Sequence, residues 1–362
     1  MFAPPPLPRT LAASLRDLSA DKPAVRASAV SDLVRHAARD DEARRTAIPL
    51  FEKALADDSP VVRSAAAVAL ADLRAREALP ALLVAIEDVD PHTRQMAINA
   101  LGEIADVRAV QRLRRALTDT RPDVRYQAVI AFTRIASARG TQDDRQDIVE
   151  TLGRALEDDD ESVRYIALRL AEEHAEADRS LGLESLVPRV VALLEGPVPH
   201  VALAAAIYLS KLGRTEGRML LLRVIEGTAK RASPDKEDER EAVEIAGALE
   251  LREAIPALER RAWGVTRVVR DTCAFHAKIA LARMGHERAV REILKDLESP
   301  RRPVREAAIV TAGRARLSQA RATIEKLADV EAELVRIALA EIDGKGPAPR
   351  SPVSEPPGEL DP

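Results

Sequence analysis

The chain has 362 residues and a formal charge of −4, which results from 55 basic and 59 acidic residues. This balance gives no global attraction to nucleic acid, and the single cysteine, Cys273, excludes an intrachain disulfide and a multi-cysteine metal site. Aromatic residues make up only 2% of the chain, so the core has to be built from small aliphatic side chains, which favours closely packed helices over sheets.

The chain begins with a proline-rich stretch, Met1 to Pro8, which lacks the cationic and apolar segments of a secretion signal. We therefore treat residues 1–14 as an N-terminal extension. The uncharged stretch at residues 198–210, like every other uncharged stretch of the sequence, is shorter than the roughly 20 apolar residues that cross a bilayer. These features predict a cytoplasmic protein without a membrane span.

From residue 15 to residue 343 one sequence motif recurs roughly every 30 to 40 residues: an acidic or proline-marked turn, a Val-Arg pair and an Ala/Leu-rich stretch. Neither helix of such a unit can bury its wide apolar face alone, so the units have to stack on one another. The predicted fold is all-α, a right-handed α-solenoid of about nine helix pairs. The arginines of this motif are Arg26, Arg63, Arg94, Arg125, Arg164, Arg270, Arg305 and Arg336, with Thr93 replacing the valine before Arg94.

Proline or acidic residues mark the start of the first helix in most pairs. The backbone N–H that proline lacks has no partner in the first turn anyway, and acidic side chains there interact favourably with the positive end of the helix dipole. Residues 140–146 and 228–240 are predicted to be longer turns, and the second of these either binds a partner or is a tolerated insertion. Residues 344–362 contain six prolines and are predicted to be a disordered tail. First helices are predicted to start near residues 23, 60, 91, 122, 161, 199, 238, 268 and 303, and a last helix from Glu331 to Ile342.

The acidic turn, the proline, the Val-Arg pair and the opening of the second helix at Ala78-Leu79-Pro80 resemble the HEAT-repeat family. The resemblance is to the short bacterial HEAT-like repeats of the phycobilin-lyase type, and it covers roughly residues 15–342. It implies that the repeated arginine bonds to an aspartate or a carbonyl of the adjacent turn. A planar guanidinium with five donors can satisfy several such acceptors at once. The predicted structural ladder consists of Arg26, Arg63, Arg94, Arg125, Arg164 and Arg305.

The sequence contains no Gly-rich phosphate loop, no nucleophile elbow and no H-E-x-x-H motif. The HEAT-like di-iron hydroxylases have several His-Glu pairs, and here only His286-Glu287 has that order. The HEAT-like DNA glycosylases combine aromatic residues with a basic surface, and this chain has one Trp. Cys273 is predicted to be a buried thiol. We therefore predict a non-enzymatic protein that has no cofactor and no metal.

When the second helices are aligned on their core leucines, one position is basic in seven of nine helices. By the family resemblance the second helices line the concave face, where these residues would form a basic stripe for an acidic partner. The position also lies in the last turn of each helix, where a cation stabilises the dipole by about 0.3 to 1 kcal/mol. Both interpretations stay open. The aligned residues are Lys53, Val84, Arg115, Arg154, Ala192, Arg223, Arg260, Lys295 and Lys326.

The helix at residues 216–226 has more apolar positions than one buried face requires, among them Met219 and Leu222. We predict an adaptor or scaffold that binds a protein through the concave face, with these two residues as apolar anchors. One alternative is a HEAT-like subunit of a modification enzyme, of lyase or hydroxylase type. The other alternative, nucleic-acid binding along the basic stripe, is disfavoured by the charge balance. The residues predicted to orient the partner are Arg115, Arg154, Arg223 and Arg260.

Overall fold

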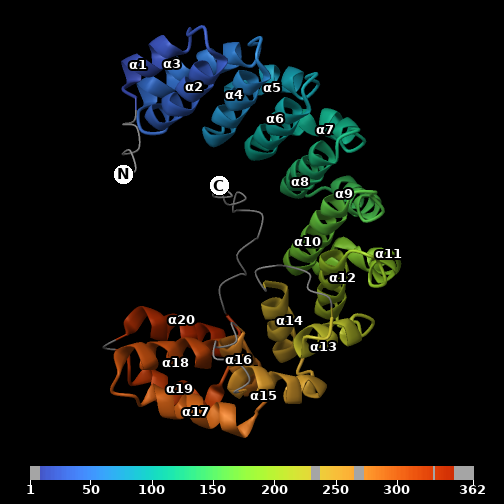
Figure 1. The fold of residues 1–362 in the computed structure, drawn as a ribbon, viewed down its shortest axis with the longest axis vertical. Coiled ribbons are helices and arrows are strands. Elements are labelled where there is room, and N and C mark those ends of the chain that lie inside the picture. The colour runs from blue at the N-terminus through green and yellow to red at the C-terminus, as the bar shows by residue number, and fades with distance from the viewer. Residues whose placement is uncertain (1–8, 230–236, 265–272, 329–330, 346–362) are drawn as a thin grey trace. The chain divides into compact units, whose positions relative to one another are not determined.

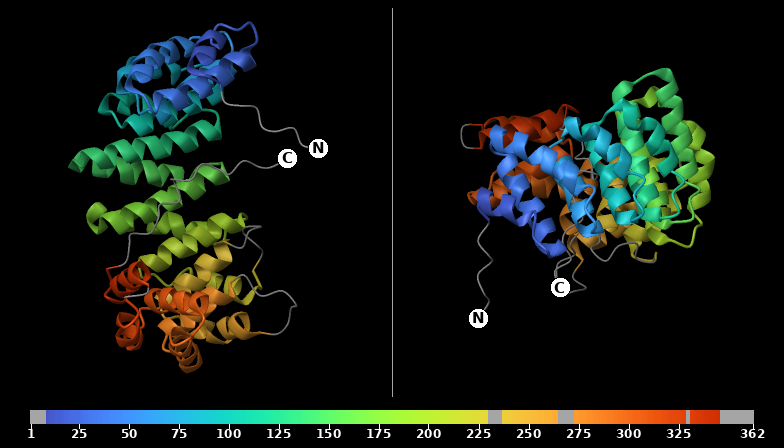
Figure 2. Two further views of the ribbon diagram at one scale, coloured as in Figure 1. Left: turned by 90° about the vertical axis from the view of Figure 1, so that its left-hand side faces the viewer. Right: turned by 90° about the horizontal axis from the view of Figure 1, so that it is seen from above.

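The structure, a computed structural model, describes residues 9–229, 237–264, 273–328 and 331–345. The described residues form 20 α-helices and six short 3-10 helices, and no strand occurs among them. The chain divides into two compact units, residues 1–189 and residues 190–362, which are described separately below (Figures 1 and 2). Of the helices in these described ranges, none combines the length and apolar character that crossing a bilayer requires.

Unit 1 (residues 1–189) is a stack of helix pairs preceded by a short helix, α1 (Leu11–Asp17), which begins within the stretch that we treated as an N-terminal extension. Arg9 binds Asp17 on α1 and Ser28 and Asp32 on the next helix, and these contacts fasten the start of the stack. The first helices are α2 (Pro23–Ala37), α4 (Pro60–Asp72), α6 (Pro91–Ile104), α8 (Pro122–Arg139) and α10 (Glu161–Ala177). The second helices are α3 (Asp41–Ala54), α5 (Leu79–Ala85), α7 (Val110–Ala116) and α9 (Gln142–Ala155), and α11 (Val187–Leu193) spans the boundary with unit 2.

Local signals set the helix ends in unit 1. The Asp90 side chain accepts a hydrogen bond from the backbone N–H of Thr93 at 2.7 Å, which satisfies a donor at the start of α6. The prediction of a longer turn at residues 140–146 is wrong, because α9 begins at Gln142. Thr141 and Asp144 form a reciprocal capping box that starts a helix within this polar stretch.

Small residues bring the first helices of unit 1 close together. A Cβ atom on Gly102 of α6 would lie 3.0 Å from the Cβ of Ala131 on α8, and Ala66 and Ala97 are fully buried on neighbouring helices. The layer whose helices approach more closely lies on the inside of a curve. Accordingly, the first helices line the concave side of unit 1 and the second helices lie on its outer side (Figure 1). The prediction that second helices line the concave face is therefore wrong for unit 1.

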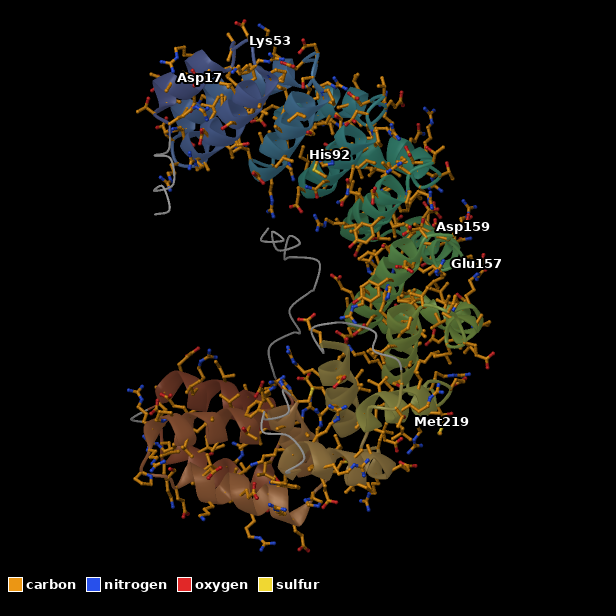
Figure 3. All side chains as sticks on the ribbon, viewed as in Figure 1. Asp17, Lys53, His92, Glu157, Asp159 and Met219 are labelled. Atoms are coloured by element: carbon orange, nitrogen blue, oxygen red, sulfur yellow. The ribbon has the colours of Figure 1, made fainter. Side chains whose placement is uncertain are left out.

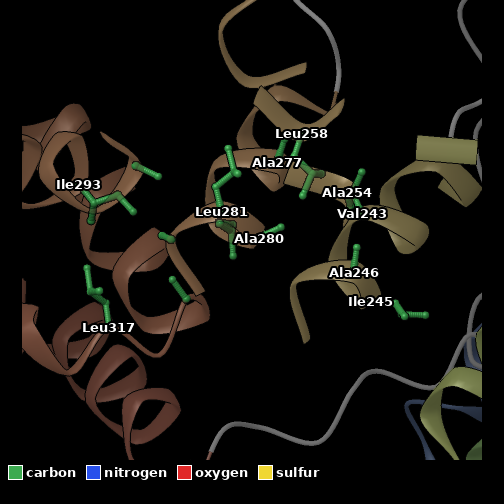
Figure 4. Packing of buried hydrophobic residues seen from close by; sticks show 14 of the residues in the cluster. Val243, Ile245, Ala246, Ala254, Leu258, Ala277, Ala280, Leu281, Ile293 and Leu317 are labelled. Carbon is green, nitrogen blue, oxygen red and sulfur yellow. The ribbon is translucent and has the colours of Figure 1, made fainter. Parts of the chain in front are cut away.

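Unit 2 (residues 190–362) continues the alternation of first and second helices. Its buried side chains, which include Leu258, Leu281 and Ile293, form one core cluster (Figure 4). Cys273 is buried directly before α16. The first helices are α12 (Pro199–Lys211), α14 (Glu237–Ala248), α16 (Ala274–Arg283), α18 (Arg302–Arg314) and α20 (Ala332–Ile342). The second helices are α13 (Arg218–Glu226), α15 (Ile255–Trp263), α17 (Glu287–Leu297) and α19 (Arg321–Glu325).

The predicted α-solenoid is confirmed: the described residues form nine helix pairs between α1 and the closing helix α20. Most first helices begin within a residue of the predicted start. The start predicted near residue 268 lies outside the described residues, and α16 begins at Ala274. The predicted tail lies outside the described residues from residue 346 onward, as do residues 230–236 of the predicted insertion.

Candidate functional site

The repeated arginines link consecutive repeats of unit 1. Arg125 donates from Nε and Nη2 to the two carboxylate oxygens of Asp158, at 2.7 and 2.6 Å, and from Nη1 to the carbonyl of Asp119 at 2.9 Å. The Asp158 carboxylate also accepts the backbone N–H of Asp160 at 2.9 Å. Each aspartate of this kind belongs to the turn that opens the next first helix. The same bidentate pair joins Arg26 to Asp57, Arg63 to Asp88, and Arg94 to Asp119.

These pairs are ionic and largely inaccessible. Burial raises the pKa of Asp57, but hydrogen bonds from Arg26 and from the Ser59 backbone outweigh this effect and hold the pKa at about 2. The pKa values of Asp119 and Asp158 are also lowered, again by arginine and backbone hydrogen bonds that outweigh burial. The paired side chains are only 11 to 16% exposed. They are therefore placed to join repeats and offer little surface to a partner.

The ladder loses its regularity beyond Arg125. Arg164 donates to the carbonyls of Asp158 and Asp159, at 2.6 and 2.9 Å, and no carboxylate binds it in the part of the chain that the structure describes. Arg305 donates to the Ser299 carbonyl at 3.0 Å and lies 3.5 Å from the carboxylate of Glu331. Glu331 lies in the turn before α20, but it does not form the bidentate pair that the aspartates of unit 1 form. Arg270 lies outside the described residues.

The basic residues of the second helices in unit 1 do not reach the concave side. Arg115 on α7 and Arg154 on α9 are 78% and 73% exposed, and both belong to the outer layer. Arg115 lies 3.7 Å from Glu87, and Arg154 pairs with Glu150 one turn before it. Lys53 also points away from the concave side (Figure 3). The predicted basic stripe therefore lies on the outer surface of unit 1, where acidic neighbours accompany it.

The other predicted contact residues lie in unit 2. Met219 on α13 is exposed (Figure 3), whereas Leu222 is partly buried against the core cluster. Arg223 is exposed on the same helix, and Arg260 is exposed on α15. Of the two predicted apolar anchors, only Met219 is therefore largely open to solvent. The role of these four residues in binding stays a prediction.

A surface that the sequence analysis missed runs along the inner helices of unit 1. On α4, Val61 and Val68 are 57% and 36% exposed, and Asp72 continues this stripe one turn later. Since the opposite side of α4 is buried and the helix belongs to the inner layer, the stripe faces the concave side; His92 on α6 lies there too (Figure 3). We use the name concave patch for nine residues at these positions of three helices: Val61, Ala65, Val68, Asp72, Met96, Asn99, Glu103, Gln127 and Arg134. The name leaves out His92 and Asp123, which are the counterparts of Val61, and Ile130, which is buried.

The concave patch is uncharged in its middle and charged at one end. Gln127 donates from Nε2 to the Asn99 side-chain oxygen at 3.1 Å. At the charged end, Glu103 pairs with Arg134 and lies 3.4 Å from Arg74. Asp72 forms no hydrogen bond or ion pair with any described residue. Burial and, after it, the charge of Glu103 raise the pKa of the Asp72 carboxyl.

The corresponding positions in unit 2 bind one another. One carboxylate oxygen of Glu244 on α14 lies 2.7 Å from Nδ1 of His276 on α16 and 2.9 Å from Nη2 of Arg314 on α18. These contacts span three successive first helices and satisfy the charges among themselves.

Within residues 9–229, 237–264, 273–328 and 331–345, no three His, Cys, Asp or Glu side chains are grouped to hold a metal ion. His286, which the sequence places in a His-Glu pair, lies 3.0 Å from Glu259 and packs its ring against Trp263, with the ring centroids 5.6 Å apart.

Two protein families match parts of this chain. Residues 48–133 match HEAT repeats, and residues 107–194 match the family of non-SMC mitotic condensation complex subunit 1. Neither match indicates repeats of the phycobilin-lyase type, which stays a prediction. No curated protein matches the sequence.

Similar solved structures include the Escherichia coli protein YibA, which is 18% identical with a TM-score of 0.54 over 76% of this chain and 93% of YibA. Importin beta is 15% identical with a TM-score of 0.50; the match covers 92% of this chain and 51% of importin beta, so the chain spans about half its length. An engineered protein is 19% identical, with a TM-score of 0.44 over 92% of this chain and 98% of its own. At these identities, the first two likenesses concern the fold alone. Together with the match at residues 48–133, they show that the chain carries HEAT repeats and folds as an α-solenoid.

Proposed function

We propose that this chain is a binding scaffold that holds a segment of another protein on the concave patch of unit 1. The observation that carries the proposal is the pair of exposed valines, Val61 and Val68, on an inner helix, with the partly exposed Ala65 between them. Aliphatic side chains gathered on a curved surface are typical of protein-binding sites. Met96 on α6 is partly exposed and extends the apolar surface to the next helix, so a bound segment would contact two repeats.

The chemistry of the concave patch supports a polypeptide as the occupant. Apolar side chains supply most of the affinity in such interfaces, and polar groups set orientation. The amides of Asn99 and Gln127 offer donors and acceptors that suit a peptide backbone. Asp72 carries an unpaired negative charge, which repels the phosphates of a nucleic acid. No observation in the described residues favours the lyase, hydroxylase or nucleic-acid alternatives.

The proposal is tested with a phage-displayed library of random 12-residue peptides selected on the full-length chain. Enriched peptides are then titrated by fluorescence anisotropy against wild type and Val68→Asp. We expect the substitution to weaken binding about tenfold or more, because it replaces an apolar contact by a charge that binding would desolvate. Circular dichroism checks that the variant is folded.

The matched control is the double variant Arg115→Glu, Arg154→Glu, which changes two exposed residues on the outer side of unit 1. It should leave the affinity of the same peptides within about twofold, since rim charges away from the interface contribute little. Equal binding of the selected peptides to wild type and Val68→Asp would show that the concave patch is not the binding surface. Failure to select any peptide would also count against the proposal.

A further inference from the structure

The charged end of the concave patch indicates what kind of segment it holds. We infer that the bound segment carries a lysine or arginine that pairs with Asp72, beside apolar side chains that cover Val68. This inference rests on the proposed function, because it assigns a charge to the partner of the same surface. It adds to the proposed function one specific ion pair, with Asp72, and the basic character of the partner segment.

Asp72 differs from its equivalents on neighbouring inner helices. At the same position, Arg35 of α2 pairs with Asp32, and Glu103 of α6 pairs with Arg134. Asp72 has no such partner among the described residues. Arg74, which follows it by two residues, is directed to Glu103 instead. Arg74 is therefore engaged elsewhere, and the side chain of Asp72 is exposed without a described partner.

Three features of the surroundings disfavour a negative charge at Asp72. Partial burial is the first and the nearby Glu103 is the second, and both raise the pKa of this carboxyl. The third is its place as the last residue of α4, since the negative end of the helix dipole lies there and no basic residue occupies the last turn. A cation delivered by a partner would oppose all three effects at once.

The neighbouring residues restrict where that cation comes from. Val68 lies one helical turn before Asp72 on the same face of α4, so their side chains are about 5 to 6 Å apart at Cβ. An apolar residue that covers Val68 and a cation that reaches Asp72 therefore fit within one short segment. A phosphate-rich ligand is disfavoured, because it would place anions against Asp72 and Glu103. A peptide with one basic and one apolar side chain would pair with Asp72 and cover Val68.

The experiment uses the same peptide selection on the full-length chain. Sequences enriched on wild type should contain Lys or Arg close to an apolar residue. Asp72→Asn should weaken these peptides about three- to tenfold, as expected for a partly buried ion pair. The matched control, Asp159→Asn, removes an exposed acidic residue on the outer side of unit 1 and should leave the affinity unchanged (Figure 3).

A charge swap gives the decisive comparison. Asp72→Arg should abolish binding of the wild-type peptides, and replacing their Lys or Arg by Glu should restore binding to this variant. Wild-type binding should also weaken with rising salt, since the pair is partly exposed. As a readout independent of binding, Asp72→Asn should keep or raise the thermal midpoint, because it removes a disfavoured charge.

The outcomes separate this inference from the proposed function. If the selected peptides lose affinity for Val68→Asp but bind Asp72→Asn and Asp159→Asn equally well, the concave patch binds peptides and the ion pair is refuted. If Val68→Asp has no effect either, the proposed function itself is refuted. Concentration-dependent dimerisation that Asp72→Arg abolishes would identify a second copy of this chain as the occupant, and it would overturn the assignment to a foreign segment.

Discussion

Removal of Arg125 tests whether the arginine ladder stabilises the fold. Arg125→Ala eliminates two charge-assisted hydrogen bonds to Asp158 and one to the carbonyl of Asp119. An exposed ion pair contributes about 0 to 1 kcal/mol, and breaking a fully buried one costs about 3 to 5 kcal/mol. The Arg125 and Asp158 side chains are 16% and 13% exposed, and Asp158 keeps its bond from the Asp160 N–H. We therefore expect a loss of about 2 to 3 kcal/mol in the free energy of unfolding.

The assay is urea unfolding at pH 7, followed by circular dichroism and by the fluorescence of Trp263. Trp263 is the only tryptophan and lies in unit 2, whereas Arg125 lies in unit 1. Circular dichroism follows the helices of both units, so the loss should be visible there. Because a chain with two units need not unfold in one step, the comparison uses the midpoints of both probes.

The control is Arg121→Ala, four residues earlier. Arg121 lies 3.8 Å from Asp123, and both side chains are more than half exposed, so this variant should lose less than about 0.5 kcal/mol. Arg125→Lys should give an intermediate loss, since an ammonium keeps the charge but not the bidentate geometry. Equal midpoints for Arg125→Ala and Arg121→Ala would refute the assignment of the ladder as a stabilising element.

Two further predictions concern acid stability and helix spacing. The folded pKa of Asp57, about 2, lies below its ordinary 3.8, so its contribution is present above pH 4 and is lost as the pH falls toward 2. The thermal midpoint of Asp57→Asn should therefore be lower than that of wild type at pH 5, and the difference should shrink by pH 2. A Cβ on Gly247 of α14 would lie 2.7 Å from the Cα of Ala280. Gly247→Ala should therefore lower the free energy of unfolding by about 1 to 2 kcal/mol, a net value that allows for the higher helix propensity of alanine. The loss should appear in the unfolding midpoint followed by Trp263 fluorescence. In Gly153→Ala of unit 1, the nearest atom is the flexible end of Leu186 at 3.3 Å. This variant is followed by circular dichroism, and a loss equal to that of Gly247→Ala would contradict the proposed cause.

Local signals explain why the helix starts of unit 1 were predictable. Pro60, Pro91 and Pro122 each stand at the first position of a first helix, and such signals act over a few residues. The start of α9 was missed because its polar residues suggested a turn, although Thr141 and Asp144 carry a capping pattern.

The layer that lines the concave side could not be predicted from local signals. It depends on how closely helices of different repeats approach each other, and therefore on contacts such as Gly102 with Ala131, which lie 29 positions apart. The family resemblance assigned the second helices to this side, and the basic stripe was built on that assignment. Once the first helices are on the inside, Arg115 and Arg154 belong to the outer surface.

The concave patch was missed for a different reason, which concerns repetition itself. Positions that contact a neighbouring repeat make the same kind of contact in successive repeats. Arg63 and Arg125 therefore both pair with an aspartate of the next turn. Positions that face away from the stack make no contact between repeats, so their residue type is free to differ from one repeat to the next. At one of them the successive inner helices of unit 1 carry Arg35, Asp72 and Glu103. A search for repeated features therefore finds the residues that hold a solenoid together. The residues that distinguish the proposed binding surface are those that break the repeat, and among them Asp72 carries a charge that no described residue pairs.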